Sequence, residues 1–115
     1  VGPSSILLAL MASGLNGQNF AFTGYLPIDK TERTKIIKQL EELVKKTGQT
    51  QIFMETPYRN NQLIETLLKT CSNNTKLCTA SDITLPTENI KTKTIAEWKQ
   101  TKINLDKKPT IFLIG

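Results

Sequence analysis

The chain has no histidine, only two cysteines and a single tryptophan among its 115 residues. Without histidine, this sequence cannot form the Ser–His or Cys–His pairs of common nucleophilic catalysts. Cys71 and Cys78 form no CxxC pair and have no histidine with which to share a metal, so we expect no metal site. Nothing supports a disulfide, and we expect both thiols to be reduced and to lie in or near the core.

Long apolar runs and targeting signals are also missing. Residues 6–12 are apolar, but this run is far shorter than the ~18–20 residues that span a bilayer. Gly2 and Pro3 precede it, where a signal peptide would have basic residues. We therefore expect a cytoplasmic protein with no membrane partner. The missing initiator methionine and the apolar end, Ile111 to Ile114, favour a domain that belongs to a longer chain.

The composition is that of one globular domain with a modest positive charge. Apolar residues make up 38% and charged residues 22%, and the net charge is +5. Much of this charge lies near the end of the chain, in Lys91, Lys93, Lys99, Lys102, Lys107 and Lys108. These lysines either form a solvated surface or contact an anionic partner such as RNA. The sequence leaves both interpretations open.

Turn residues and apolar periodicity divide the chain into alternating helices and strands. Pro3 and the serines after it favour a helix start, and Gly14 favours its end. That first helix is apolar almost all round, so we expect it to be buried on most sides. Asp29 and Glu32 form a capping-box pattern before the longest helix. We expect helices over residues 4–13, 31–46, 59–71 and 95–101, and strands over residues 20–26, 50–55, 76–83, 89–94 and 110–115.

Apolar stripes show which helix faces should be buried. Strands that alternate with helices, and that are apolar on both sides, predict a layered α/β sheet with some parallel pairing. Trp98 is expected to pack inward. The stripe of the long helix consists of Ile36, Ile37, Leu40, Leu43 and Val44, and that of the next helix of Leu63, Ile64, Leu67 and Leu68.

Two segments could bind a ligand. The run Gly2-Pro3-Ser4-Ser5 opens a helix, and free N–H groups at a helix start suit an anion, although ordinary helices also begin this way. The run 53–59 ends a strand with Glu55, Tyr58 and Arg59 directly before a helix, where open α/β sheets bind ligands. Arg59 could hold an anionic ligand or lock the turn by pairing with Glu55. There is no Gly-rich phosphate loop.

These segments join in a family pattern. GPSSILLALMASGL, then FAFTGYLP, then the long polar helix, then IFMETPYR together resemble the C-terminal domain of tetrapyrrole methylases. The resemblance is greatest to the branch that methylates a ribose 2′-hydroxyl of small-subunit ribosomal RNA. It implies a mixed, roughly five-stranded sheet flanked by helices, packed beside an N-terminal domain that this sequence lacks. It also implies S-adenosylmethionine as methyl donor, held in the cleft between the two domains.

The resemblance also implies which residues bind. Ser4 and Ser5 match the segment beside the methionine end of the donor, and Pro109 enters the last strand near the adenine, followed by Thr110. The donor-binding residues implied in this way are Ser4, Ser5, Met54, Glu55, Ile83 and Pro109, and Tyr58 and Arg59 are implied on the substrate side. The family commonly dimerises, so a homodimer is expected.

A methyltransferase is compatible with the missing histidine. The donor's methyl group is activated before it binds, so the enzyme mainly aligns the acceptor and excludes water. No catalytic base is identified, although Glu55 is a candidate if a ribose hydroxyl must lose its proton. Ribosomal RNA is the expected acceptor. The alternatives are a tetrapyrrole ring carbon, a protein residue, or an RNA-binding module without enzymatic activity.

Overall fold

The computed structural model describes the backbone of residues 3–115 and the side chains of residues 4–115, so Gly2 of the first motif lies outside the described residues. Every predicted helix and strand is present, with ends that differ by one or two residues. A short 3₁₀ turn, η1, precedes α3. The elements are α1 Pro3–Ser13, β1 Phe20–Tyr25, α2 Lys30–Thr47, β2 Thr50–Met54, η1 Pro57–Arg59, α3 Asn60–Thr70, β3 Lys76–Ser81, β4 Asn89–Thr94, α4 Ile95–Lys99 and β5 Thr110–Ile114.

Local hydrogen bonds explain where the helices begin and end. The Asp29 carboxylate accepts from the Glu32 amide at 3.0 Å at the start of α2, and Gly48 ends this helix in the left-handed conformation with φ of 72°. Among the described residues, Asp29 and Glu32 form only this half of the expected capping box. The reciprocal box occurs instead at α4, between Thr94 and Glu97.

The five strands form one mixed sheet in the order β1-β2-β5-β3-β4. Only β1 and β2 are parallel, and every other neighbouring pair is antiparallel. The expected mixed five-stranded sheet is therefore confirmed. The last strand in the sequence lies at the centre of the sheet, where it joins the β1–β2 pair to the β3–β4 hairpin.

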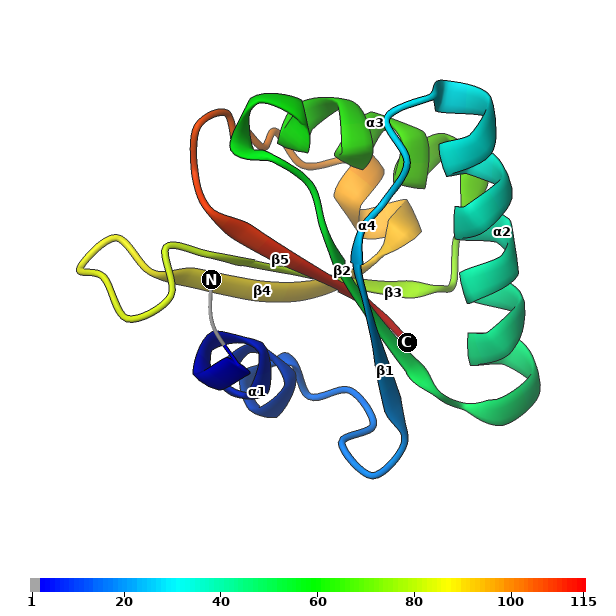
Figure 1. The fold of residues 1–115 in the computed structure, drawn as a ribbon, viewed down its shortest axis with the longest axis horizontal. Helices are drawn as coiled ribbons and strands as arrows, with labels where there is room; N and C mark the ends of the chain where they lie inside the picture. The colour runs from blue at the N-terminus through cyan, green and yellow to red at the C-terminus, as the bar shows by residue number, and fades with distance from the viewer. Residues whose placement is uncertain (1–2) are drawn as a thin grey trace.

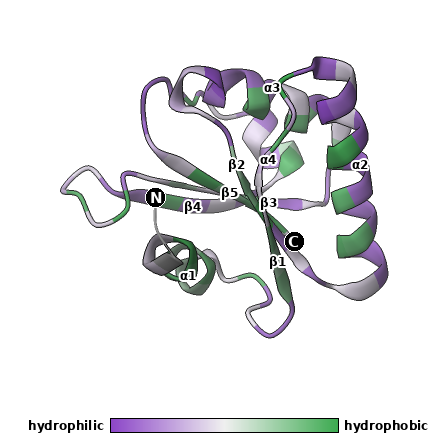
Figure 2. Cartoon of the chain, in the orientation of Figure 1, coloured by the Kyte–Doolittle hydropathy of each residue, from purple (hydrophilic) through white to green (hydrophobic). Residues whose placement is uncertain are grey.

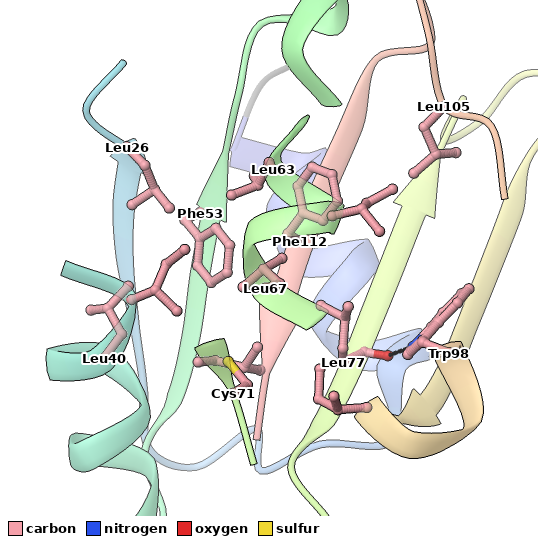
Figure 3. Packing of buried hydrophobic residues seen from close by; sticks show 14 residues of the cluster. Leu26, Leu40, Phe53, Leu63, Leu67, Cys71, Leu77, Trp98, Leu105 and Phe112 are labelled. Atoms are coloured by element: carbon pink, nitrogen blue, oxygen red, sulfur yellow. Dashed lines mark hydrogen bonds between the residues drawn. The ribbon is translucent and has the colours of Figure 1, made fainter. Parts of the chain in front are cut away.

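The helices cover the two faces of the sheet unequally (Figure 1). The three helices α2, α3 and α4 cover one face, and α1 lies alone on the other. The larger core lies on the three-helix face (Figure 3), where the rings of Phe53 and Phe112 stack with centroids 6.2 Å apart. Trp98 is buried there, as predicted, and its indole Nε1 donates to the Leu77 carbonyl at 2.7 Å.

The smaller core lies under α1. Ala9 and Leu10 pack on the sheet residues Ile52, Cys78, Ala80, Ile111 and Leu113. The expectation that α1 is buried on most sides is wrong, because Leu7 is 50% exposed and Met11 80% exposed. A helix alone on a sheet face can contact that sheet with only one side, so its apolar surface extends beyond the contact (Figure 2).

The long helix α2 shows a smaller difference of the same kind. Ile37 and Leu40 are buried and Ile36 and Val44 partly buried, as the stripe predicts, but Leu43 is 42% exposed. The predicted stripe is therefore wider than the surface that β2 and α3 cover. The stripe of α3 is correct, with Leu63, Ile64 and Leu67 buried and Leu68 partly buried.

Both cysteines are free and buried, as expected. Burial raises the pKa of the Cys71 thiol to about 12, and the neighbouring Glu41 carboxylate adds to this shift. Burial also raises the pKa of Cys78. Within residues 3–115, no helix is both long enough and apolar enough to cross a membrane.

Candidate functional site

The ends of β2 and β3 meet at one edge of the sheet. Both strands are antiparallel to β5, and both finish beside its beginning: Met54 pairs with Ile111, and Ser81 pairs with Thr110. Helix α1 starts at the same edge. Ser5 shares a pocket with Ile111, whereas Leu15, just after the helix, packs against Gly115 at the far end of β5. The first helix therefore begins at the edge of the sheet where the second and third strands end.

A pocket of about 200 Å³ lies at this edge, on the α1 face of the sheet. Its wall is mostly apolar, with one carboxylate and one hydroxyl. Four segments contribute to it, namely the start of α1, the end of β3, the turn after β3 and the start of β5. The lining residues are Ser5, Ala80, Asp82, Ile83, Leu85, Pro109 and Ile111.

Three residues that sequence reasoning assigned to donor binding line this pocket together: Ser5, Ile83 and Pro109. They come from positions up to about a hundred residues apart, which makes the convergence informative. Met54 is buried, and strand alternation directs it, like Ile52, to the α1 face, beside its partner Ile111.

The other predicted residues do not line the pocket. Ser4 is exposed, and Thr110 is buried in β5 with its side chain turned toward Asn60. Tyr58 is 74% exposed at the surface. Glu55 and Arg59 lie just beyond the end of β2 and also do not contribute to the wall. The structure thus brings together the helix start, the turn after β3 and the last strand, and leaves the 55–59 segment beside them.

Glu55 is buried and holds its own turn. Its Oε1 accepts from the Thr56 amide at 2.7 Å and lies 3.3 Å from Nε of Arg59. Of the two roles that the sequence leaves open for Arg59, this contact supports the one in which it pairs with Glu55 and holds the turn. Oε2 of Glu55 is buried without a hydrogen-bond partner among the described residues. A buried carboxylate oxygen without a donor is costly, and a donor supplied from outside the described residues would offset that cost.

Asn60 connects this turn to the pocket, and sequence reasoning missed it. Its side chain is completely buried, and its Nδ2 lies 2.6 Å from the Lys108 carbonyl, 3.1 Å from the Leu105 carbonyl and 3.3 Å from the Thr110 hydroxyl. Asn60 therefore fixes the loop that places Pro109 in the pocket. Its one visible signal was an asparagine at the start of a helix directly after a ligand-type motif.

Asp82 is the second residue that sequence reasoning did not select. It is the one carboxylate in the pocket wall, and its Oδ2 accepts from the Thr87 hydroxyl at 2.9 Å. Its φ is 52° and that of Thr84 is 71°. Residues other than glycine rarely adopt this left-handed region, and they often do so at functional sites. An acid directly after an apolar strand was the signal available in the sequence.

Comparison with known proteins finds relatives of similar sequence. No protein-family model matches the chain. The ribosomal RNA small subunit methyltransferase I of Buchnera aphidicola from Schizaphis graminum is 33% identical over 98% of this chain, and the protein of the same name from Vibrio cholerae is 30% identical over 84%. The chain spans 39% and 32% of the lengths of these two relatives.

Solved structures agree with this relationship at the level of the fold. Cobalt precorrin-4 methyltransferase aligns over 96% of this chain and 48% of its own length, with a TM-score of 0.61 at 15% identity. The methyltransferase CobJ aligns over 95% of this chain and 46% of its own, with a TM-score of 0.58 at 17% identity. The chain is similar in sequence to these ribosomal RNA methyltransferases and has the fold of the tetrapyrrole methyltransferases. The mixed five-stranded sheet flanked by helices is the fold that the resemblance implied.

Proposed function

We propose that this chain is the C-terminal domain of an S-adenosylmethionine-dependent methyltransferase and that its α1-face pocket forms one wall of the donor site. The carrying observation is the convergence of Ser5, Ile83 and Pro109 on that pocket. The names of the homologous methyltransferases support the reaction. A Thermus thermophilus uroporphyrin-III C-methyltransferase of the same fold, with a TM-score of 0.52, was solved with S-adenosylhomocysteine bound.

The size and chemistry of the pocket fit part of the donor. Complete small-molecule pockets measure ~300–1,000 Å³, so a pocket of about 200 Å³ suits a wall completed by a second domain. The apolar residues Ile83, Leu85 and Ile111 can hold the adenine and exclude water. The Ser5 hydroxyl and the Asp82 carboxylate can bind the polar groups of the donor. When bound, the donor supplies a methyl group that its sulfonium has already activated.

The residues of the chain contribute positioning more than acid–base chemistry. Asn60 and the Glu55–Arg59 pair hold the loop and the turn around the pocket, which fixes the geometry in which an acceptor must align. The free Oε2 of Glu55 is the candidate base if the acceptor is a hydroxyl, although donor binding suits its position equally well.

We propose that the remainder of a longer protein packs beside α1. The larger part of each curated relative lies outside the match. Leu7, Leu8 and Met11 are exposed on the helix whose first turn lines the pocket. An apolar helix surface beside an incomplete ligand site suits a covering domain. Homodimer formation stays a prediction, which sedimentation analysis of the protein would check.

We propose ribosomal RNA as the methyl acceptor of the whole protein. The names of the relatives and the net charge of +5 support a polyanionic substrate. A tetrapyrrole ring is the alternative, supported by the solved structures of cobalamin and porphyrin enzymes, whose likeness to this chain is one of fold. Transfer of a radiolabelled methyl group to 30S subunits, with uroporphyrinogen as the competing acceptor, would distinguish the two.

The donor pocket can be tested on this chain directly. In a titration with S-adenosylhomocysteine followed by ¹H–¹⁵N NMR, we expect the backbone amides of Ser5, Ile83 and Ile111 to shift. Ile83→Trp, which fills the pocket, should abolish these shifts. Leu43→Trp, on the exposed side of α2, is the matched control and should leave them intact. Shifts confined to the three-helix face, or no shift at millimolar ligand, would contradict the proposal.

A further inference from the structure

A second pocket, distinct from the donor pocket, lies on the three-helix face of the sheet. It measures about 190 Å³. Residues of β3, β4 and α4 and the loop before β5 line it, and the lining contains lysines, hydroxyls and amides but no carboxylate. Its polar lining residues include Ser81, Lys91, Thr101, Lys102, Asn104 and Lys108. We call this hollow the lysine pocket.

Three lysines from two segments that are distant in the sequence converge on this pocket. Lys91 extends from β4, and Lys102 and Lys108 extend from the loop that joins α4 to β5. Among residues 3–115, none of the three forms a salt bridge. Ammonium groups gathered around a hollow without a carboxylate repel one another, and an anion placed between them removes that repulsion.

The pocket also has a neutral donor suited to an anion. Oδ1 of Asn104 accepts from the side-chain amide of Asn61 and from the Asp106 amide, each at 3.0 Å. These two bonds fix the orientation of the Asn104 amide group, and its Nδ2 has no acceptor among the described residues. Ser81 and Thr101 use their hydroxyl protons on the carbonyls of Asn89 and Glu97. The lysines, the Asn104 amide and the side chains of Thr79 and Asn89 are therefore the polar groups of the lining that are left for a ligand.

The two pockets lie back to back at the same edge of the sheet. Ser81 lines the lysine pocket and Asp82 the donor pocket; Lys108 lines the lysine pocket and Pro109 the donor pocket. One residue of each pair lines each pocket, so the chain itself separates the two pockets at these points. An extended chain that passes over this edge can contact both faces at once.

We propose that the pocket of Lys91, Lys102, Lys108 and Asn104 binds a backbone phosphate of the RNA substrate, on the opposite face of the sheet from the donor. This inference rests on the proposed function for the identity of the polyanion. Two interpretations of the terminal lysines were open, and the proposal assigns contact with RNA to Lys91, Lys102 and Lys108. Lys93, in contrast, has partners within the chain, because it donates to Thr101 and lies over the Trp98 ring.

The test compares two triple variants of equal charge. Lys91→Gln, Lys102→Gln and Lys108→Gln remove the pocket lysines. Lys35→Gln, Lys38→Gln and Lys46→Gln remove three exposed lysines of α2 and serve as the control. Affinity for a fluorescent single-stranded RNA is measured by anisotropy from 25 to 200 mM salt, and circular dichroism checks the fold of each variant.

We expect the pocket variant to lose about tenfold in affinity at low salt and its salt slope to fall by about 0.7 for each phosphate no longer neutralised. The control should change affinity by less than about twofold. Equal losses in the two variants, or no RNA binding by the unaltered chain at 25 mM salt, would overturn the inference. Uridine monophosphate that binds as tightly as the oligonucleotide would show a mononucleotide site instead.

Titration of the same variants with S-adenosylhomocysteine separates this inference from the proposed function. We expect the variant without the pocket lysines to bind S-adenosylhomocysteine like the unaltered chain, because these lysines lie on the opposite face of the sheet from the donor pocket. If RNA binding depends on the three lysines but S-adenosylhomocysteine never binds, the proposed methyltransferase function fails and the lysine pocket remains a phosphate site. If S-adenosylhomocysteine binds and the two triple variants bind RNA equally, only the proposed role of the lysine pocket is refuted.

Discussion

Asn60 and Lys108 are joined by a partly buried hydrogen bond of 2.6 Å, from the side-chain amide of the first to the backbone carbonyl of the second. The bond ties the first residue of α3 to the loop that enters β5. Because Lys108 lines one pocket and Pro109 the other, a single side chain positions the shared edge of both candidate sites.

We expect Asn60→Ala to lower the free energy of unfolding by about 2–4 kcal/mol, because it removes a buried amide that donates to the carbonyls of Leu105 and Lys108 and opens a small cavity. Urea unfolding monitored by circular dichroism measures this change. Asn74→Ala, at an exposed position on the loop before β3, is the control and should stay within about 0.5 kcal/mol. A loss no larger than that of the control would show that the Asn60 bonds contribute little.

Glu55 should matter for ligand binding more than for folding. We expect Glu55→Ala to weaken S-adenosylhomocysteine binding several-fold, because the variant frees Arg59 and removes the buried carboxylate beside the pocket. The dissociation constant from NMR titration is the measurement, with a circular dichroism spectrum to show that the fold is intact. Glu42→Ala, which breaks an exposed pair with Lys46, should have no effect, and unchanged affinity in Glu55→Ala would remove Glu55 from the donor site.

Cys71 should react very slowly with alkylating reagents while the protein is folded. With the pKa raised from 9.0 to about 12, its thiolate fraction at pH 8 falls about 1,000-fold relative to an ordinary thiol of that starting pKa. Iodoacetamide labelling followed by mass spectrometry should show protection in buffer and rapid labelling in 8 M urea. Rapid labelling of Cys71 in the folded protein would mean that the thiol is accessible.

The same shift predicts how stability depends on pH. The folded state keeps the Cys71 proton at pH values where the unfolded chain has lost it. This contribution to stability is therefore fully present below pH 9 and is lost as the pH rises toward 12. The difference in unfolding free energy between the unaltered chain and Cys71→Ala should shrink over that range, and a constant difference would contradict the assignment.

The one-sided burial of α1 can be tested with two substitutions on neighbouring residues. Leu10→Ala should cost about 2–5 kcal/mol, because Leu10 is 4% exposed and packs on the sheet. Met11→Ala, at a position 80% exposed, should stay within about 0.5 kcal/mol. Thermal unfolding in the same buffer compares them, and similar losses in both variants would mean that Met11 is covered in solution.

Much of this protein follows from its sequence. The helices and strands were predictable to within one or two residues, because caps such as Gly48 and apolar periodicity act over a few neighbouring positions. The resemblance carried by four motifs implied the mixed sheet, and the positions carried over from that resemblance included three residues that line the pocket, Ser5, Ile83 and Pro109. Each of these inferences needed only local patterns or a resemblance of ordered segments.

Only the tertiary structure decided the rest. The sequence showed that α1 is apolar but not that one face of a single sheet would cover it, so the exposure of Met11 could not be foreseen. It did not reveal that Asn60 would support Lys108, or that lysines of β4 and of the loop before β5 would line one hollow. Periodicity records which side chains avoid water, whereas the partners of a buried amide or the members of a pocket depend on how distant segments meet.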